Sequence, residues 1–299
     1  MRRIGLTLAI SLLAVASFAH PHPHSRNVSI HTDGSERFGD CSSRNVSFDG
    51  ERAAVQREEI SAAGLGSLRV KSGRGGVSVR GGNAWSIVAC KAAPSDAALR
   101  NINVRLSGNE LSHDGDTDGD WYVFYYVTAP RNAELSVEAT NGPVALRDVE
   151  GQLTVRASNG PLSLSNVSGR VDVETTNGPI SINGGSGNVK VAAKNGPLSV
   201  TLAGASWNGE LEASTKNGPL SVRVPRNYRS AVLVESLGHG PVSCKAEGCA
   251  AIRARNESRN DDDHWGHRDR MPRSFELGSG PRNVRLSTVN GPLTVKDSD

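Results

Sequence analysis

Hydrophobic residues alternate with polar ones in short runs along most of the chain. A representative unit has Leu153, Val155 and Ala157 in one run, followed by Leu162 and Leu164 in a second run. Alternation with a period of two over five or six residues predicts a β-strand with one buried face and one exposed face. We therefore expect two short, half-buried strands in each unit.

The tripeptide Asn-Gly-Pro separates the two runs and recurs along the chain. Its asparagines are Asn141, Asn159, Asn177, Asn195, Asn217 and Asn290. The first four lie 18 residues apart, and the next step is 22 residues. A degenerate copy, Arg74-Gly75-Gly76, precedes them, and a variant, His239-Gly240-Pro241, follows Asn217 after another 22 residues. A period of 18–22 residues is typical of stacked coils.

The chemistry of Asn-Gly-Pro predicts a corner between two strands. Asn tolerates a left-handed backbone, and Gly accepts the conformations that a sharp corner needs. Pro lacks a backbone donor and fits best at the first residue of a strand, which is its place here. A second Gly turn closes each unit at the other end. Its glycines are Gly151, Gly169, Gly187 and Gly209.

Two all-β architectures fit this unit of strand, corner, strand and corner. In a two-sided parallel β-solenoid, or β-helix, equivalent positions stack one coil apart, at about 4.8 Å. In an antiparallel meander every corner would be a hairpin, and Asn-Gly does favour hairpins. We favour the solenoid of 18–22-residue coils because identical corners in register would stack Asn on Asn in a hydrogen-bonded ladder.

The N-terminus has the pattern of a secretory signal peptide over residues 1–19. Arg2 and Arg3 precede an apolar run that is too short to span a bilayer, and we expect cleavage after Ala19. Residues 20–66 are expected to form a flexible leader and an N-terminal cap. Residues 67–299 are expected to form the solenoid, interrupted by a polar loop insertion at 250–280. We expect an exported protein, either periplasmic or at the cell surface and extracellular.

The charge of the chain limits its partners, and an even number of cysteines in an exported chain predicts disulfides. The formal net charge of +3 comes from 34 Lys and Arg against 31 Asp and Glu, and removal of Arg2 and Arg3 leaves 32 against 31, or +1. That balance predicts neither nucleic acid nor an anionic membrane as partner, and no later segment is apolar enough to be transmembrane. Four cysteines allow three disulfide connectivities. We favour Cys244–Cys249, which are close in sequence, and by elimination Cys41–Cys90.

The repeats resemble a known family. Val127-Thr128-Ala129-Pro130, then Leu135-Ser136-Val137 and the reiterated units from Asn141 onward, are similar to the bacterial putative-adhesin family of β-strand repeat proteins (DUF4097-like). The resemblance covers roughly residues 67–299. It implies surface adhesion and brings no catalytic residues. The chain departs from the family in the Pro after almost every Asn-Gly and in the 250–280 insertion.

Some residues outside the repeat pattern could carry chemistry. Asp114, Asp116, Asp118 and Asp120 have the spacing of a calcium loop, but Tyr125 replaces the Glu of a complete EF-hand, so at most a weak calcium site is predicted. Otherwise no cofactor is expected. His20, His22 and His24, and the stretch 261–267, could bind a transition metal.

An aromatic strand offers a second candidate site. Trp121, Tyr122 and Tyr126 could stack on a sugar ring or a partner, or could instead pack against the N-terminal cap. Asp172 and Glu174 share one outward face. They are the basis of the alternative hypothesis, a carbohydrate-active enzyme on a β-helix. Motifs of common hydrolases and nucleotide-binding enzymes are missing from the sequence. We expect a non-catalytic binding or adhesion-type scaffold of the cell envelope, with a polysaccharide or protein ligand. A structural or regulatory envelope component is a further alternative.

Overall fold

The protein is all-β, as predicted. The computed structural model describes residues 28–30, 38–41, 46–116, 119–254 and 271–298. Its main strands join in one large sheet that nearly closes on itself. The predicted signal peptide, His20, His22, His24, Asp118 and the stretch 261–267 lie outside the described residues. Within the described part of the chain, no helix has the length and apolar character needed to cross a membrane.

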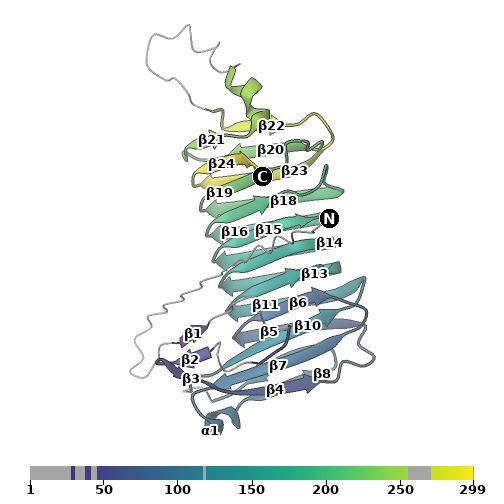
Figure 1. Cartoon of the computed structure of the whole chain (residues 1–299), viewed down its shortest axis with the longest axis vertical. Coiled ribbons are helices and arrows are strands. Elements are labelled where there is room, and N and C mark those ends of the chain that lie inside the picture. The colour runs from purple at the N-terminus through teal and green to yellow at the C-terminus, as the bar shows by residue number, and fades with distance from the viewer. Residues whose placement is uncertain (1–27, 31–37, 42–45, 117–118, 255–270, 299) are drawn as a thin grey trace, which may run out of the picture.

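The central part of the chain, residues 133–224, winds in successive coils that have one strand on each of two facing sides (Figure 1). The strands that lead into a corner asparagine form the Asn sheet: β11 (Ala133–Asn141), β13 (Glu150–Asn159), the second half of β14 (Leu162–Asn177), β16 (Gly187–Asn195) and β18 (Gly209–Asn217). The strands that follow a corner proline form the Pro sheet: β12 (Val144–Arg147), the first half of β14, β15 (Ile180–Gly185), β17 (Leu198–Thr201) and β19 (Leu220–Val224).

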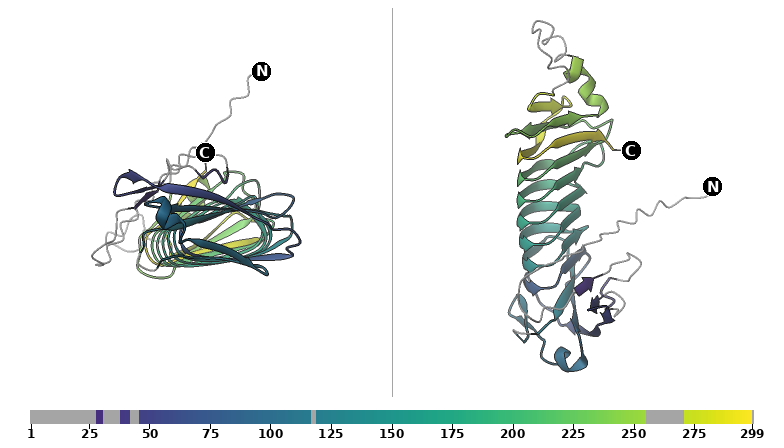
Figure 2. Two further views of the ribbon diagram at one scale, coloured as in Figure 1. Left: turned by 90° about the horizontal axis from the view of Figure 1, so that it is seen from below. Right: turned by 90° about the vertical axis from the view of Figure 1, so that its left-hand side faces the viewer.

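Units one period apart lie on one another in parallel, as predicted. Leu153 pairs with Val171 in the Asn sheet, and Leu162 pairs with Ile180 in the Pro sheet. Every strand pairing within residues 133–224 is parallel, so the antiparallel meander is wrong for this part. Seen end-on in Figure 2, the two sheets face each other across a thin interior. Val, Leu and Ile fill it, with Val155, Leu164 and Val173 at 0 % exposure.

The corner asparagines form the expected amide ladder. Nδ2 of each Asn donates to Oδ1 of the Asn in the preceding coil, over 2.8–3.1 Å, in the pairs Asn159–Asn141, Asn177–Asn159, Asn195–Asn177, Asn217–Asn195 and Asn290–Asn217. The backbone of the corner is also paired between coils, since Gly178 N donates to Asn195 O at 3.0 Å. A side-chain amide can bond to the coil above and to the coil below, because it carries both a donor and an acceptor. These six asparagines therefore tie neighbouring corners together.

The extra length of the 22-residue unit has a specific structural cause. Its extra residues precede β18 and carry Trp207, which is buried at 3 % exposure. The indole Nε1 donates to Gly187 O at 2.9 Å, and Asn283 Nδ2 donates to Trp207 O at 2.5 Å. The longer unit thus adds a buried aromatic ring to the corner that Gly209 closes.

The N-terminal end departs from a regular solenoid. β5 (Ser67–Arg74) and β6 (Val77–Gly81) form a coil that pairs in parallel with β11 and β12. Beyond it, β7 (Ser86–Ala93) runs antiparallel to β4 (Ala54–Ile60) and to β10 (Tyr122–Ala129).

The remaining strands of this end form a hairpin. β8 (Asn103–Ser107) and β9 (Glu110–Asp114) are antiparallel to each other, after the short helix α1 (Asp96–Leu99). β9 and β10 still pair in parallel with β5 and β6. The prediction of parallel coils throughout 67–299 is therefore wrong for β7 and β8, whose pairings are antiparallel. β7 is buried on both faces over most of its length, so it lacks the alternation of a coil strand.

Three short N-terminal strands lie beside the array (Figure 1). β1 (Val28–Ile30), β2 (Val46–Phe48) and β3 (Glu51–Arg52) form a small antiparallel sheet. It packs against the outer face of β10, where Phe48 and Tyr122 have ring centroids 6.1 Å apart. Residues 54–60, expected to belong to the leader and cap, form the edge strand β4.

At the C-terminal end the strands do not follow sequence order. β20 (Ala231–Ser236) and β21 (Val242–Cys244) form the outer coil, and β23 (Arg282–Asn290) and β24 (Leu293–Asp297) lie between that coil and β18–β19. The insertion predicted at 250–280 is not all loop. The 3-10 turn η1 (Glu247–Cys249) leads into helical residues 250–254, and β22 (Ser274–Leu277) pairs antiparallel with β20.

Candidate binding surface

The outer face of the Pro sheet carries a column of small side chains, one from each coil. In spatial order these residues are Ser78, Ala145, Ser163, Ser181, Ser199, Ser221, Thr294 and Ser243. All are half-buried. Neighbouring strands lie about 4.8 Å apart, so the column is a flat, evenly spaced row in which hydroxyl groups predominate.

A second column, two residues further along each strand, is basic at both ends and neutral in the middle. It consists of Arg80, Arg147, Ser165, Asn183, Thr201, Arg223, Lys296 and Lys245. We call Arg223, Lys296 and Lys245 the basic triad. All three are exposed, and they come from three successive coils in space.

The basic triad has no acidic partner in the described part of the chain. The nearest acidic groups in sequence are otherwise engaged, since Asp297 accepts from the Glu247 amide at 3.1 Å and lies 4.0 Å from Arg226. Three like charges one strand apart repel one another within a Debye length of about 10 Å at 0.1 M salt. An anion over the triad would relieve that repulsion.

Sequence reasoning missed the triad because its members are far apart in the chain. Each ends a copy of Pro-x-Ser/Thr-x-Arg/Lys, at residues 219–223, 241–245 and 292–296. The shared position within the repeat was the available signal. Their adjacency depends on the unexpected order of the C-terminal coils.

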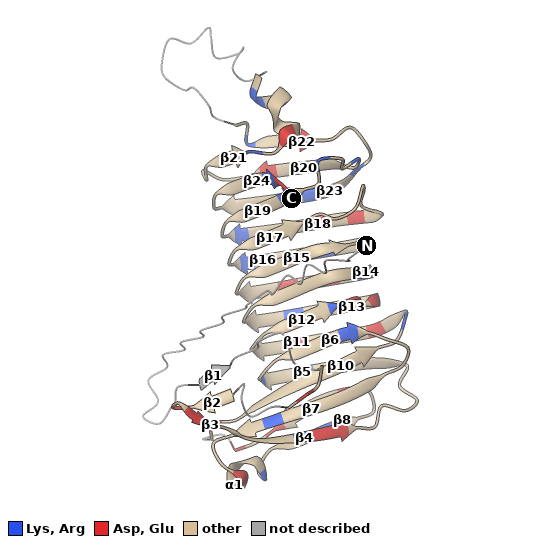
Figure 3. Cartoon of the chain, viewed as in Figure 1, with Lys and Arg blue, Asp and Glu red and all other residues tan. Residues whose placement is uncertain are grey.

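The Asn sheet presents a different outer face, on which opposite charges are paired. Arg156 binds Asp172 at 3.0 Å and Glu174 at 3.2 Å, and Arg285 lies 3.7 Å from Glu235. Figure 3 shows basic and acidic residues interspersed along the array. Asp172 and Glu174 are well exposed and share one arginine, which is not the desolvated setting that a general acid needs. This geometry does not favour the polysaccharide-active alternative.

The predicted aromatic site lies largely under other parts of the chain. Trp121 is 8 % exposed, and its Nε1 donates to Asp116 O at 2.8 Å. Tyr126 contacts Phe38 edge-on with ring centroids 5.3 Å apart, and Tyr122 stacks on Phe124 beneath the small N-terminal sheet. Burial raises the pKa of Tyr122. The geometry favours the packing interpretation of these aromatics over a binding role.

A partly buried polar cluster lies behind this aromatic strand. His113 Nε2 accepts from the Arg74 amide at 3.4 Å, and its Nδ1 lies 2.9 Å from the Tyr125 hydroxyl. A ring that accepts at Nε2 carries its proton on Nδ1, so His113 is neutral and donates to Tyr125. The Arg74 guanidinium stacks over Trp121, 5.3 Å from the ring centre. Burial lowers the pKa of His113 to about 4 and raises that of Tyr125.

We expect His113 to make the protein less stable in acid. Its pKa in the folded state is about 4, below the ordinary value of 6.5, so the unfolded chain binds a proton that the folded chain excludes. This contribution is complete above pH 6.5 and is lost as the pH falls toward 4, by about 3 kcal/mol at most at ~1.4 kcal/mol per pKa unit. Urea unfolding at several pH values, compared with His113→Asn, measures it. An equal pH dependence in the variant would contradict this assignment.

The predicted calcium ligands are not gathered around one point in the described residues. Asp114 pairs with Arg105 and accepts from Asn103 Nδ2 at 3.0 Å. Among the residues that the structure describes, no group of three or more metal-binding side chains occurs. Asp116 and Asp120 flank residues 117 and 118, which lie outside the described ranges.

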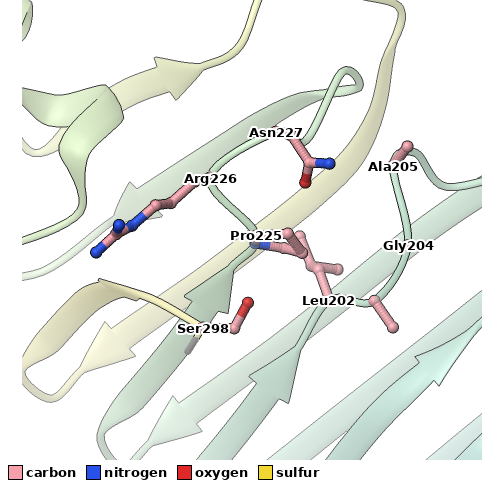
Figure 4. Close-up of a pocket in the computed structure, with 8 residues that line it drawn as sticks. Leu202, Gly204, Ala205, Pro225, Arg226, Asn227 and Ser298 are labelled. Carbon is pink, nitrogen blue, oxygen red and sulfur yellow. The ribbon is translucent and has the colours of Figure 1, made fainter. Parts of the chain in front are cut away.

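An open pocket of about 810 Å³ marks the corner where the chain climbs from β19 to β20 (Figure 4). Its lining residues are Leu202, Ala203, Gly204, Ala205, Pro225, Arg226, Asn227 and Ser298. Arg226 extends away from the other labelled side chains. The pocket holds few polar groups that converge, and we assign it no ligand.

Both favoured disulfides are present. Cys41–Cys90 joins the N-terminal segment to β7 with a Cα–Cα distance of 5.4 Å, and Cys244–Cys249 closes the turn after β21 at 6.1 Å. The first bond holds residues 38–41 against the aromatic strand. The second connects the outer coil to η1.

The chain belongs to the Toastrack DUF4097 family. The family profile matches residues 58–240, which is more than half of the chain and includes the first coils, the central array and β20. This confirms the family resemblance stated from the repeats. Among curated proteins, none is similar enough to count as a match.

The chain is also similar to several solved structures. A putative cell adhesion protein from Clostridium sporogenes has 10% identity and a TM-score of 0.36, with 83% of this chain and 100% of the other covered. A putative adhesin from Bacteroides fragilis has 11% identity and a TM-score of 0.33, with coverage of 83% and 98%. A putative lipid binding protein from Parabacteroides distasonis has 8% identity and a TM-score of 0.26, with coverage of 82% and 97%.

Proposed function

We propose that this chain is an exported, non-catalytic binding scaffold of the adhesin type, acting in the cell envelope or at the cell surface. Its central array is a two-sided parallel β-solenoid whose flat outer faces hold side chains in fixed columns. Stacked repeats give such surfaces without large conformational change. Family membership, the two disulfides and the Pro-sheet columns support this proposal.

The basic triad indicates the class of partner that this scaffold would bind. Arg223, Lys296 and Lys245 are exposed, adjacent and without an acidic partner in the described residues, and a row of hydroxyl groups lies beside them. A chain with repeated negative charges can contact several of these groups at once, and its hydroxyl or carboxylate oxygens can bond the serines. We therefore propose an acidic envelope polysaccharide as the ligand. The neutral overall charge of the chain does not conflict with this, because the attraction is local.

Neutralising the triad is expected to weaken binding to an acidic polysaccharide by a factor between about three and about one hundred. Each exposed charge contributes about 0.2–1 kcal/mol, and 1.4 kcal/mol is a factor of ten. The mature protein and its Arg223→Gln/Lys296→Gln/Lys245→Gln variant would be titrated onto immobilised polygalacturonate and alginate at low and high salt. Dextran serves as the neutral polymer.

A matched triple variant makes the test specific to the Pro sheet. Arg170→Gln/Lys194→Gln/Lys216→Gln removes the same charge from exposed positions of the Asn sheet. The proposal requires that this control keep its affinity and that added salt weaken the unmodified protein. Equal losses in both triple variants would reduce the effect to net charge, and no binding to either acidic polymer would overturn the choice of ligand.

A further inference from the structure

The last coil of the sequence occupies a slot between two coils that precede it in the chain. We call residues 282–297, that is β23 and β24, the C-terminal coil. The slot lies between the coil of β18 and β19 and the coil of β20 and β21. Figure 1 shows these yellow strands between green ones.

The C-terminal coil makes every strand pairing across this slot. β23 pairs in parallel with β18 on one side and β20 on the other, and β24 does the same with β19 and β21. Its inward residues Val284, Leu286, Leu293 and Val295 are at most 1 % exposed. Without this coil, two rows of backbone donors and acceptors would face each other unpaired, and such edges recruit other strands. The slot is therefore a complete strand-binding site.

The segment between β19 and β20 spaces the outer coil away from β19, which leaves room for one coil between them. Residues 225–230 cross two strand spacings from β19 to β20, and Ser230 is buried on the way. A regular coil could have stacked directly on β19, as the central coils do. The outer coil is thus held at the distance that one intervening coil requires.

The segment that precedes the C-terminal coil extends these contacts, so that β20 of the outer coil is paired on both edges. β22 pairs with the far edge of β20 while β23 pairs with its near edge, and residues 278–281 pass around the start of β20. A Cβ on Gly280 would lie 2.1 Å from Arg229 O, so this connection packs closely on the chain that it crosses. The unit that fills the slot therefore comprises residues 271–298.

We propose that the slot also accepts residues 271–298 of a second copy of this chain. Every pairing in the slot joins that unit to β18–β21, and none depends on covalent continuity with the outer coil. A donated unit would make the same hydrogen bonds and bury the same side chains. Reciprocal exchange closes a two-fold dimer, whereas successive exchange links copies end to end. This route would give a binding scaffold several copies of its surface, and it does not depend on the proposed ligand.

Two single-cysteine variants test the exchange directly. Ser214 on β18 pairs with Ser287 on β23, and both side chains are half-buried on the outer face. Paired positions of adjacent strands are about 4.8 Å apart, within the range that a disulfide spans. Full-length Ser214→Cys and Ser287→Cys proteins would be mixed, held near the urea midpoint without reductant, returned to buffer and oxidised. We expect a covalent heterodimer on a non-reducing gel.

The controls make either result decisive. Ser214→Cys mixed with Ser199→Cys, whose cysteine lies on the opposite sheet, reports random collision, and exchange predicts at least tenfold more heterodimer than this background. The double variant Ser214→Cys/Ser287→Cys shows whether the pair can form a bond within one chain. If the double variant closes but the mixed single variants give only background dimer, the slot accepts its own coil alone and the proposal is overturned.

Discussion

Leu162→Asp is expected to unfold the coils around it. Leu162 is 2 % exposed and pairs between Val144 and Ile180, so its side chain lies inside the array with aliphatic neighbours above and below. Losing a buried Leu costs about 2–5 kcal/mol, and a buried charge without a partner costs several more. The sum is comparable with the whole stability of a domain, about 5–15 kcal/mol. No coil can bury its face alone, so neighbouring coils are expected to open with it.

Ser163→Asp is the matched control, one position along the same strand. Ser163 points outward between Ala145 and Ser181, where a carboxylate keeps its water. Its effect is expected to stay within about 0.5 kcal/mol. Urea unfolding followed by far-UV circular dichroism compares the two variants. Equal losses of stability would show that the assignment of inward and outward positions is wrong.

The regular array could be predicted because three local signals agree. The period-two runs give the strands, Asn-Gly-Pro gives the corner, and the 18-residue spacing gives the register. Leu162, Ile180 and Leu198, spaced by that period, stack as expected. Agreement of pattern, turn chemistry and packing is what makes a sequence specify one structure.

Strand order at the two ends could not be predicted. A repeat fixes the register in which two coils pair, but it does not determine which coils are neighbours. Any Asn-Gly-Pro coil can pair with any other. The variants hold a clue: Arg74 and His239 replace Asn in the first coil and in the outer coil, whereas Asn290 lies inside the array. An interior corner needs a side chain that both donates and accepts, and an end corner needs only one function. The degenerate copies thus mark the two ends of the Asn ladder.

The candidate site was harder to predict than the fold. The aromatic side chains on β10 left two interpretations open, a ligand site or packing against the N-terminal cap, and Phe38 and Phe48 from the N-terminal segment pack on Tyr126 and Tyr122. Contacts between segments far apart in sequence leave no periodic signal. The basic triad was missed for the same reason, since its adjacency follows from the inserted C-terminal coil.

Gly178→Ala is expected to destabilise the array by about 3–5 kcal/mol. Gly178 is the corner glycine of its coil, with φ of +132°, and an added Cβ would lie 2.1 Å from the carbonyl oxygen of Gly160 one coil below. That oxygen belongs to a paired backbone and cannot move freely. Backbone strain costs about 1–3 kcal/mol and overpacking about 1–3 more. The corner must open, which also breaks the bond from Gly178 N to Asn195 O.

Gly204→Ala separates conformational strain from the stacking contact. Gly204 also has a positive φ, +69°, but a Cβ there would meet nothing within 4 Å. It is expected to lose only the 1–2 kcal/mol, roughly, that a left-handed alanine costs. Thermal and urea unfolding of both variants measure the difference. If Gly178→Ala were no worse than Gly204→Ala, the corners could not be stacked as closely as the Asn ladder requires.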